Sequence, residues 1–186
     1  MSDFHLQRAV HHLRQGGVVL HATEGVWGLA CDPFSQQAVA RLLAAKQRSV
    51  SKGLLVIASQ ASEFAPELAG LSGTQRSAIE ASWPGAHTWV VPNERFPAWI
   101  TGAFSSVGIR VPGHPQARAL SAAFGGPLVS TSANLAGRPS PVRQLQAVRA
   151  QRELTGGMRC YRLPGETIAP GRPSTIRAVS GGVIRA

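Results

Sequence analysis

Apolar residues recur at helical spacing in several segments of the chain. Leu6, Val10 and Leu13 lie on one face of a helix that we predict over residues 3–15, and Gly16-Gly17 ends it. Further helices are predicted over residues 36–46, 72–82 and 115–124, and around Val142, Leu145 and Val148. Ser35 is the expected N-cap of the helix at residues 36–46, and Ser72 is the expected N-cap of the helix at residues 72–82.

Short apolar runs bounded by glycine, proline or polar residues predict strands between these helices. The predicted strands are residues 18–21, 54–58, 87–91, 105–112, 127–132 and 158–163, followed by a hairpin of residues 173–179 and 183–185. The order strand, helix, strand over residues 105–132 indicates a crossover with parallel pairing. Residues 22–33 contain two glycines, and we expect a segment there in which the backbone approaches a ligand. These elements predict one α/β domain over residues 1–186.

The polar cluster that follows the predicted strand at residue 127 is the first candidate for a binding site. Ser130-Thr131-Ser132-Ala133-Asn134 offers three hydroxyls and one amide within five residues, and no acid lies near it. Small neutral donors at the end of a strand suit an anion at a sheet edge. An ordinary polar turn that caps the next helix is the alternative interpretation.

A cluster of cations follows the helix predicted over residues 36–46. The chain has only two lysines, Lys46 and Lys52, and both lie with Arg48 in one segment of seven residues. Cations at a helix C-terminus are favourable to the helix dipole, which is the simpler explanation. Three cations before a buried strand also suit a phosphate group, and we expect that role here.

The overall composition is that of a globular domain, with 44% hydrophobic and 15% charged residues. The longest apolar runs are shorter than the ~18 residues that a membrane helix needs, and the N-terminus lacks a signal-peptide pattern, so we expect a soluble cytoplasmic protein. Cys31 and Cys160 are expected to be reduced and buried, with a bridge between them left open by the sequence.

The positive charge is unevenly distributed. The net charge is +10, and residues 110–186 carry nine of these charges because eleven arginines face only Glu153 and Glu166. This asymmetry indicates an anionic partner such as nucleic acid or nucleotide phosphates, with a basic solvated surface as the alternative. Arg110 alternates with Ile109 and Val111 in a strand, so a half-buried guanidinium there would require an anion.

Several common kinds of site have no signature in the sequence. The six histidines form no metal-binding pattern, and the nucleophile-elbow, P-loop and Rossmann glycine patterns are all missing from it. Cations together with hydroxyl groups instead suit nucleotidyl or phosphoryl transfer, where positioning and charge neutralisation do most of the work.

Taken together, these segments resemble the YrdC-like family, the L-threonylcarbamoyladenylate synthases of the short bacterial type. The resemblance runs from Gly17 to Arg185. Its carriers are Ala22-Thr23-Glu24 with Gly28-Leu29, Lys46-Gln47-Arg48, Trp83-Pro84-Gly85, Arg110-Val111-Pro112, Ser130-Thr131-Ser132-Ala133-Asn134 with Gly137, and Pro173-Ser174-Thr175-Ile176.

The resemblance implies a twisted mixed parallel and antiparallel sheet with flanking helices around a basic cavity. It implies an enzyme that joins L-threonine, bicarbonate or CO2, and ATP into threonylcarbamoyl-AMP and pyrophosphate, with Mg²⁺ accompanying ATP and with no metal held by the protein. Partner proteins then transfer the threonylcarbamoyl group to tRNA, and the basic surface offers a direct tRNA contact.

The resemblance also implies roles for individual residues. The catalytic set is Lys46, Arg48, Ser132 and Asn134. The residues expected to bind ATP are Lys46, Arg48, Lys52, Ser106, Asn134 and Arg185. The residues expected to bind threonine are Thr23, Arg110, Ser132 and Ser174.

The sequence departs from the family pattern at a few positions, and two other functions stay open. Gly25, Trp27, Ser49 and Ala86-His87 replace residues common in the family, chiefly on the threonine side. A tRNA-binding or double-stranded RNA-binding module without turnover is one alternative, supported by the charge of residues 110–186. A paralogous carbamoyl-adenylate enzyme with another substrate is the second alternative.

Overall fold

The computed structural model describes residues 3–155 and 160–185 of the chain. The helices are α1 (Asp3–Arg14), α2 (Gln36–Ala45), α3 (Ala65–Ala69), α4 (Gly73–Ala81), α5 (Ala98–Thr101), α6 (Pro115–Phe124) and α7 (Gln144–Thr155), with short 3-10 turns η1 (Val50–Lys52) and η2 (Ala61–Phe64). The strands are β1 (Val18–Ala22), β2 (Trp27–Cys31), β3 (Leu55–Ile57), β4 (His87–Pro92), β5 (Ser106–Arg110), β6 (Leu128–Ser132), β7 (Cys160–Arg162), β8 (Thr175–Ala178) and β9 (Val183–Arg185).

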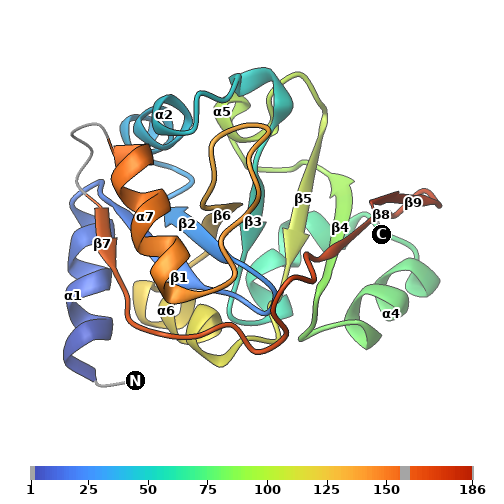
Figure 1. The fold of residues 1–186 in the computed structure, drawn as a ribbon. Coiled ribbons are helices and arrows are strands. Elements are labelled where there is room, and N and C mark those ends of the chain that lie inside the picture. Colours follow the sequence, from blue (N-terminus) through green and yellow to red (C-terminus); the bar gives the residue numbers. More distant parts are fainter. Residues whose placement is uncertain (1–2, 156–159, 186) are drawn as a thin grey trace.

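All the strands of the described residues belong to one mixed sheet in the order β7-β1-β2-β6-β3-β5-β4-β8-β9. The β7 end lies beside α1, and the β8–β9 hairpin lies at the opposite end (Figure 1). Three pairs are parallel, namely β1 with β7, β3 with β5, and β4 with β8, and the other pairs are antiparallel. The predicted α/β class with a mixed sheet is therefore confirmed.

The expected location of the parallel pairing was wrong. The strands on either side of α6, β5 and β6, are not neighbours, because β3 lies between them. β3 is parallel to β5 and antiparallel to β6, so β5 and β6 run in opposite directions. The short connection that contains α6 therefore reverses the chain, and the parallel neighbours are linked by longer segments.

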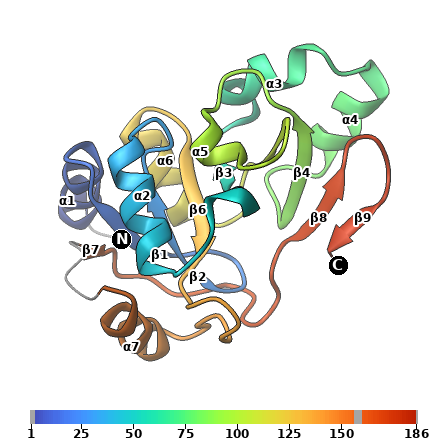
Figure 2. The ribbon, with the colours of Figure 1, turned by 90° about the horizontal axis from the view of Figure 1, so that it is seen from above.

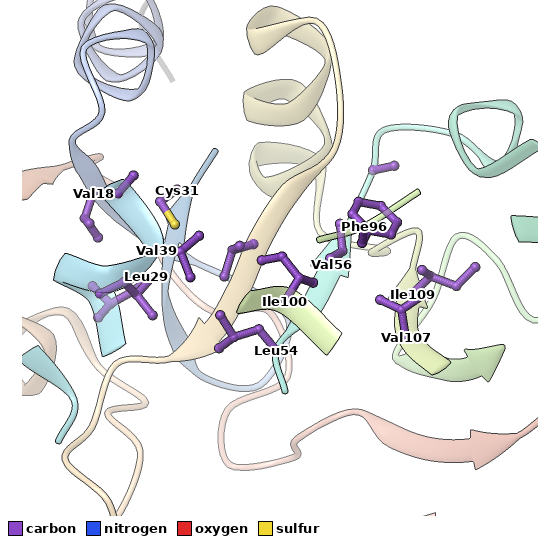
Figure 3. Packing of buried hydrophobic residues seen from close by; sticks show 14 of the residues in the cluster. Val18, Leu29, Cys31, Val39, Leu54, Val56, Phe96, Ile100, Val107 and Ile109 are labelled. Carbon is purple, nitrogen blue, oxygen red and sulfur yellow. The ribbon is translucent and has the colours of Figure 1, made fainter. Parts of the chain in front are cut away.

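Two apolar clusters pack on opposite faces of the sheet. The larger one combines alternate strand residues such as Leu29, Val56 and Ile109 with side chains of α2, α5 and α7 (Figure 3). The smaller one combines the intervening residues, such as Val19 and Ile57, with α1 and α6. Figure 2 shows α1 and α6 close together above the β1 end of the sheet. The period of two along each strand thus divides the core into two layers.

The other predicted elements agree with the structure to within a few residues, except for β2. Residues 27–31 form a buried strand that was not predicted. It was missed because Gly28 and Ala30, which alternate with Trp27, Leu29 and Cys31, give no polar contrast along the segment. The short elements η1, η2, α3 and α5 were also not predicted. The predicted caps Ser35 and Ser72 each accept a backbone N–H bond, and residues 158 and 159 of the predicted strand lie outside the described residues.

Both cysteines are free thiols. Cys31 is buried and Cys160 is half-buried, and burial raises the pKa of each thiol, that of Cys160 to about 12. Among residues 3–155 and 160–185, no helix combines the length and the apolarity that crossing a bilayer requires.

We expect Ile109→Ala to destabilise the domain more than any change at the surface. Ile109 is fully buried in β5 between two neighbouring strands, so the truncation leaves a cavity and costs about 3 kcal/mol of unfolding free energy. Urea unfolding followed by circular dichroism measures this cost. The control is Ile168→Ala, at a residue with 61% exposure, which we expect to cost under about 0.5 kcal/mol. Equal costs at the two positions would contradict this account of the core.

Candidate active site

A cavity of about 510 Å³ opens on the sheet face that also carries the smaller apolar cluster. Its floor is formed by the small or polar residues that alternate with core residues along the strands. Examples are Gly28 of β2, Ser130 of β6 and Gly108 of β5, each of which points away from the larger cluster. A Cβ at Gly108 would lie 2.3 Å from Leu55 Cδ2, so a larger residue there would force the Leu55 side chain to move. Short side chains on one face of the sheet therefore make room for a ligand.

The described wall of the cavity carries basic side chains and no carboxylate. The basic residues that line it are Arg48, Lys52, Arg110, Arg172 and Arg185. The hydroxyl residues that line it are Thr23, Thr88, Thr101, Ser106, Ser130, Thr131, Ser132, Ser140 and Ser174. This combination of cations and hydroxyl groups suits an anionic ligand with many oxygen atoms.

Lys46 does not line the cavity but holds its wall in place. Its ammonium group donates to the backbone carbonyls of Ser132 and Asn134, the latter at 2.7 Å. Burial, together with the charge of the nearby Arg48, lowers the pKa of Lys46 to about 8. One buried cation thus joins the end of α2 to the polar turn after β6.

The turn after β6 is also braced by its own side chains. The Ser132 hydroxyl donates to Asn134 Oδ1, and Asn134 Nδ2 donates to the backbone carbonyls of Leu135 and Arg138. The amide of Asn134 therefore makes its hydrogen bonds within the turn. Ser132 lines the cavity, and Asn134 does not.

Lys46 and Arg48 point in different directions because Gln47 adopts a left-handed conformation with φ of 49°. Arg48 Nη2 donates to the Gly53 carbonyl at 2.9 Å, which holds the loop around η1, and the guanidinium lines the cavity. Burial lowers the pKa of Arg48. The Lys46-Gln47-Arg48 segment therefore supports two separate parts of the wall.

Arg110 is the last residue of β5, and its guanidinium has an anionic partner within the protein. Its guanidinium forms an ion pair with Glu24, and Arg110 Nε donates to the Gly85 carbonyl at 2.8 Å. The strand pattern predicted that a half-buried guanidinium at this position needs an anion, and Glu24 is that anion. The partner comes from the loop between β1 and β2, which no local pattern links to β5.

Arg185 of β9 lines the cavity and contacts Ser174, another lining residue. Arg185 Nη2 donates to the Ser174 carbonyl at 2.7 Å, and the Ser174 hydroxyl lies 3.1 Å from that of Thr88. Burial lowers the pKa of Arg185, and the charge of Arg110 lowers it further, so the two guanidinium groups are close.

Sequence reasoning located most of this wall and missed several of its members. Of the residues predicted to form the site, all line the cavity except Lys46 and Asn134, which brace it from behind. Arg172 and Thr88 were missed. Alternation along the strand at residues 87–91 could have revealed Thr88, whereas Arg172 lies in a loop without periodicity. The Thr23 hydroxyl lines the wall but donates to the Val26 carbonyl at 2.7 Å.

Comparison with known sequences gives close relatives. The threonylcarbamoyl-AMP synthase of Cellvibrio japonicus is 51% identical over 142 residues, which cover 76% of this chain and 75% of that protein. The threonylcarbamoyl-AMP synthase of Chromohalobacter salexigens is 46% identical over 175 residues, which cover 94% of this chain and 92% of that protein.

Comparison with solved structures and family models agrees with these relatives. The structure of P. abyssi Sua5 complexed with L-threonine superposes with a TM-score of 0.86 at 28% identity, over 97% of this chain and 52% of that chain. The chain thus spans about half the length of that protein. The family model Sua5/YciO/YrdC, described as "Telomere recombination", matches residues 11–186. The chain therefore belongs to the Sua5/YciO/YrdC family.

Proposed function

We propose that this protein is a threonylcarbamoyl-AMP synthase. It condenses L-threonine, bicarbonate or CO2, and ATP into L-threonylcarbamoyl-AMP and pyrophosphate. The observation that carries the proposal is a cavity whose described wall holds cations and hydroxyl groups but no carboxylate, in a chain whose relatives bear this name over most of their length. A cavity of about 510 Å³ also has the size of a site for a nucleotide-sized ligand.

The phosphate end of the site is formed by the loop after α2. Arg48 and Lys52 line it and have no ion-pair partner among the described residues, so both charges are available to a triphosphate. Ser106 and Arg185 complete the nucleotide contacts, and Lys46 acts through the turn that it holds. Charge-assisted hydrogen bonds of this kind contribute about 1.5–3 kcal/mol each.

The amino-acid end lies where Arg110 reaches the cavity. Its guanidinium suits the bidentate recognition of a threonine carboxylate. Thr23, Ser132 and Ser174 surround that position with hydroxyl groups that contact the rest of threonine. P. abyssi Sua5, which shares this fold, forms a complex with L-threonine, and that complex supports an amino-acid substrate for this chain.

In the proposed reaction the substrates react directly with one another in two steps. The threonine amine captures CO2, and a carbamate oxygen then attacks the α-phosphorus of ATP and displaces pyrophosphate. The protein contributes positioning and charge neutralisation, which supply most of the catalysis in transfers of this type.

Mg²⁺ and the protein partners belong to the same proposal. We assign Mg²⁺ to the phosphates of ATP, because this ion is commonly bound by phosphate oxygens and water molecules. The product is passed in the cytoplasm to proteins that transfer the threonylcarbamoyl group to tRNA. The exposed arginines of α7, Arg149 and Arg152, offer a surface for direct contact with that tRNA.

The substrate assignment is tested by incubating the protein with ATP, Mg²⁺, bicarbonate and each amino acid in turn. We expect mass spectrometry to detect a carbamoyl-adenylate with L-threonine, together with release of pyrophosphate. A reaction without bicarbonate is the control and should give none. Product with a different amino acid would favour a paralogous enzyme, and tRNA binding without any adenylate would favour an RNA-binding module.

We expect Lys46→Ala to lower pyrophosphate release by about 100-fold or more, because the turn that carries Ser132 loses its anchor. Circular dichroism should show an intact fold. Lys52→Ala is the matched control, since Lys52 is exposed at the rim, and we expect it to raise KM for ATP with a smaller effect on kcat. Release at the wild-type rate by Lys46→Ala would show that Lys46 has no role in turnover.

A further inference from the structure

Arg172 is a cation of the cavity wall that the proposed contacts leave unused. It lines the cavity, it is exposed, and it lies in the loop of residues 163–174 that joins β7 to β8. Among the residues that the structure describes, its guanidinium has neither a hydrogen bond nor an ion-pair partner. The other lining arginines, Arg48, Arg110 and Arg185, each donate to a backbone carbonyl. Arg172 thus keeps all its N–H groups available to a ligand.

The loop of residues 163–174 is held against the β1–β2 loop by main-chain hydrogen bonds. The Ala169 N–H donates to the Glu24 carbonyl at 2.7 Å, and the Gly171 N–H donates to the Gly25 carbonyl at 2.9 Å. Figure 1 shows the loop passing along the lower side of the sheet from β7 to β8. These contacts place the backbone of Arg172 beside Gly25.

Gly25 is the residue that lets the two loops approach so closely. A Cβ on Gly25 would lie 1.8 Å from the carbonyl oxygen of Arg172 and 2.5 Å from its carbonyl carbon. Both are backbone atoms, so a side chain at this position would displace the loop of residues 163–174. Gly25 lines the cavity and directly follows Glu24, the ion-pair partner of Arg110. Arg172 therefore lies at the end of the cavity that we assign to the amino acid.

The charges at this end leave room for a second cation. Glu24 compensates the charge of Arg110. In the proposed reaction L-threonine presents a carboxylate and, once its amine has captured CO2, also a carbamate, so the adduct carries two negative charges. Arg172 adds a positive charge without an internal partner, and the planar fork of its N–H groups matches either of these anions.

We propose that Arg172 is a further substrate-binding residue, whose guanidinium holds a carboxylate-type group of the amino-acid substrate. That group is the carboxylate of L-threonine or the carbamate formed on its amine. Gly25 is a positioning residue, because it sets where Arg172 lies. This inference rests on the proposed function, since it concerns the amino acid and the carbamate of that reaction.

The test measures KM for L-threonine, bicarbonate and ATP separately in Arg172→Gln, by pyrophosphate release. The side chain is exposed and makes no hydrogen bond within the described residues, so circular dichroism should show an intact fold. We expect KM for L-threonine or bicarbonate to rise about tenfold, as for the loss of one charge-assisted hydrogen bond, with KM for ATP unchanged. Arg172→Lys, which keeps the charge, should recover part of the loss.

Isothermal titration with L-threonine alone distinguishes the two anions. Weaker binding by Arg172→Gln without bicarbonate identifies the carboxylate as the bound group. Unchanged binding together with a raised KM for bicarbonate identifies the carbamate. An Arg172→Gln variant that changes KM for ATP alone, or none of the three KM values, would overturn the proposal and leave the proposed function intact.

Arg177→Gln is the matched control, because Arg177 is a second exposed arginine, lies in β8 and does not line the cavity. It removes the same charge from the molecule, and its three KM values should equal those of the wild type. A rise as large as that in Arg172→Gln would assign the effect to net charge and overturn the proposal.

Gly25→Ala tests the positioning role. We expect it to raise the same KM as Arg172→Gln, and the double variant should be no worse than Gly25→Ala alone, because both changes act on one interaction. Additive losses would overturn the positioning role of Gly25. A wild type that makes no threonylcarbamoyl-AMP would overturn the proposed function. In that case equal binding of L-threonine by the wild type and Arg172→Gln would overturn the role of Arg172 as well.

Discussion

The period of two along the strands is the constraint on which the rest of this structure depends. In β5 the residues on one face, Val107 and Ile109, are large and apolar, whereas Ser106, Gly108 and Arg110 on the other face line the cavity. The first set packs against α2 and α5 and stabilises the domain. The second set leaves the volume that becomes the cavity. A shift of one residue in the register would bury the polar set and expose the core, so folding and site formation are specified together.

The buried amine of Lys46 links this sheet to the helical layer. Its two bonds to carbonyls compensate for the loss of hydration, which alone would make a buried lysine unfavourable. The same bonds set where Ser132 meets the cavity. A lysine suits the position because its ammonium group is compact and donates in three directions, whereas the planar fork of an arginine requires more room.

The sequence predicts those features of the fold and the site whose pattern lies within one short segment of the chain. Helices α1, α2 and α6 and the β8–β9 hairpin were predicted because periodicity, caps and glycine turns lie within each segment. Strand β2 was missed because Gly28 and Ala30 remove the contrast on which alternation depends. The pairing of Glu24 with Arg110 and the bond from Lys46 to the turn join residues about 90 positions apart, and no local pattern carries such contacts. The clusters at residues 46–52 and 130–134 were found from their chemistry, whereas the roles of Thr23, Ser106, Ser174 and Arg185 came only from the family resemblance.

The arrangement of charges divides the cavity into two chemically different ends. Within residues 3–155 and 160–185, Arg48 and Lys52 have no ion-pair partner, so that end has a positive potential that suits phosphates. At the other end Glu24 compensates Arg110, so the positive potential from Arg110 is reduced there. The ion pair that satisfies the buried guanidinium therefore makes this end less attractive to phosphates than the end with Arg48 and Lys52, and the proposed function requires such a division between a phosphate end and an amino-acid end.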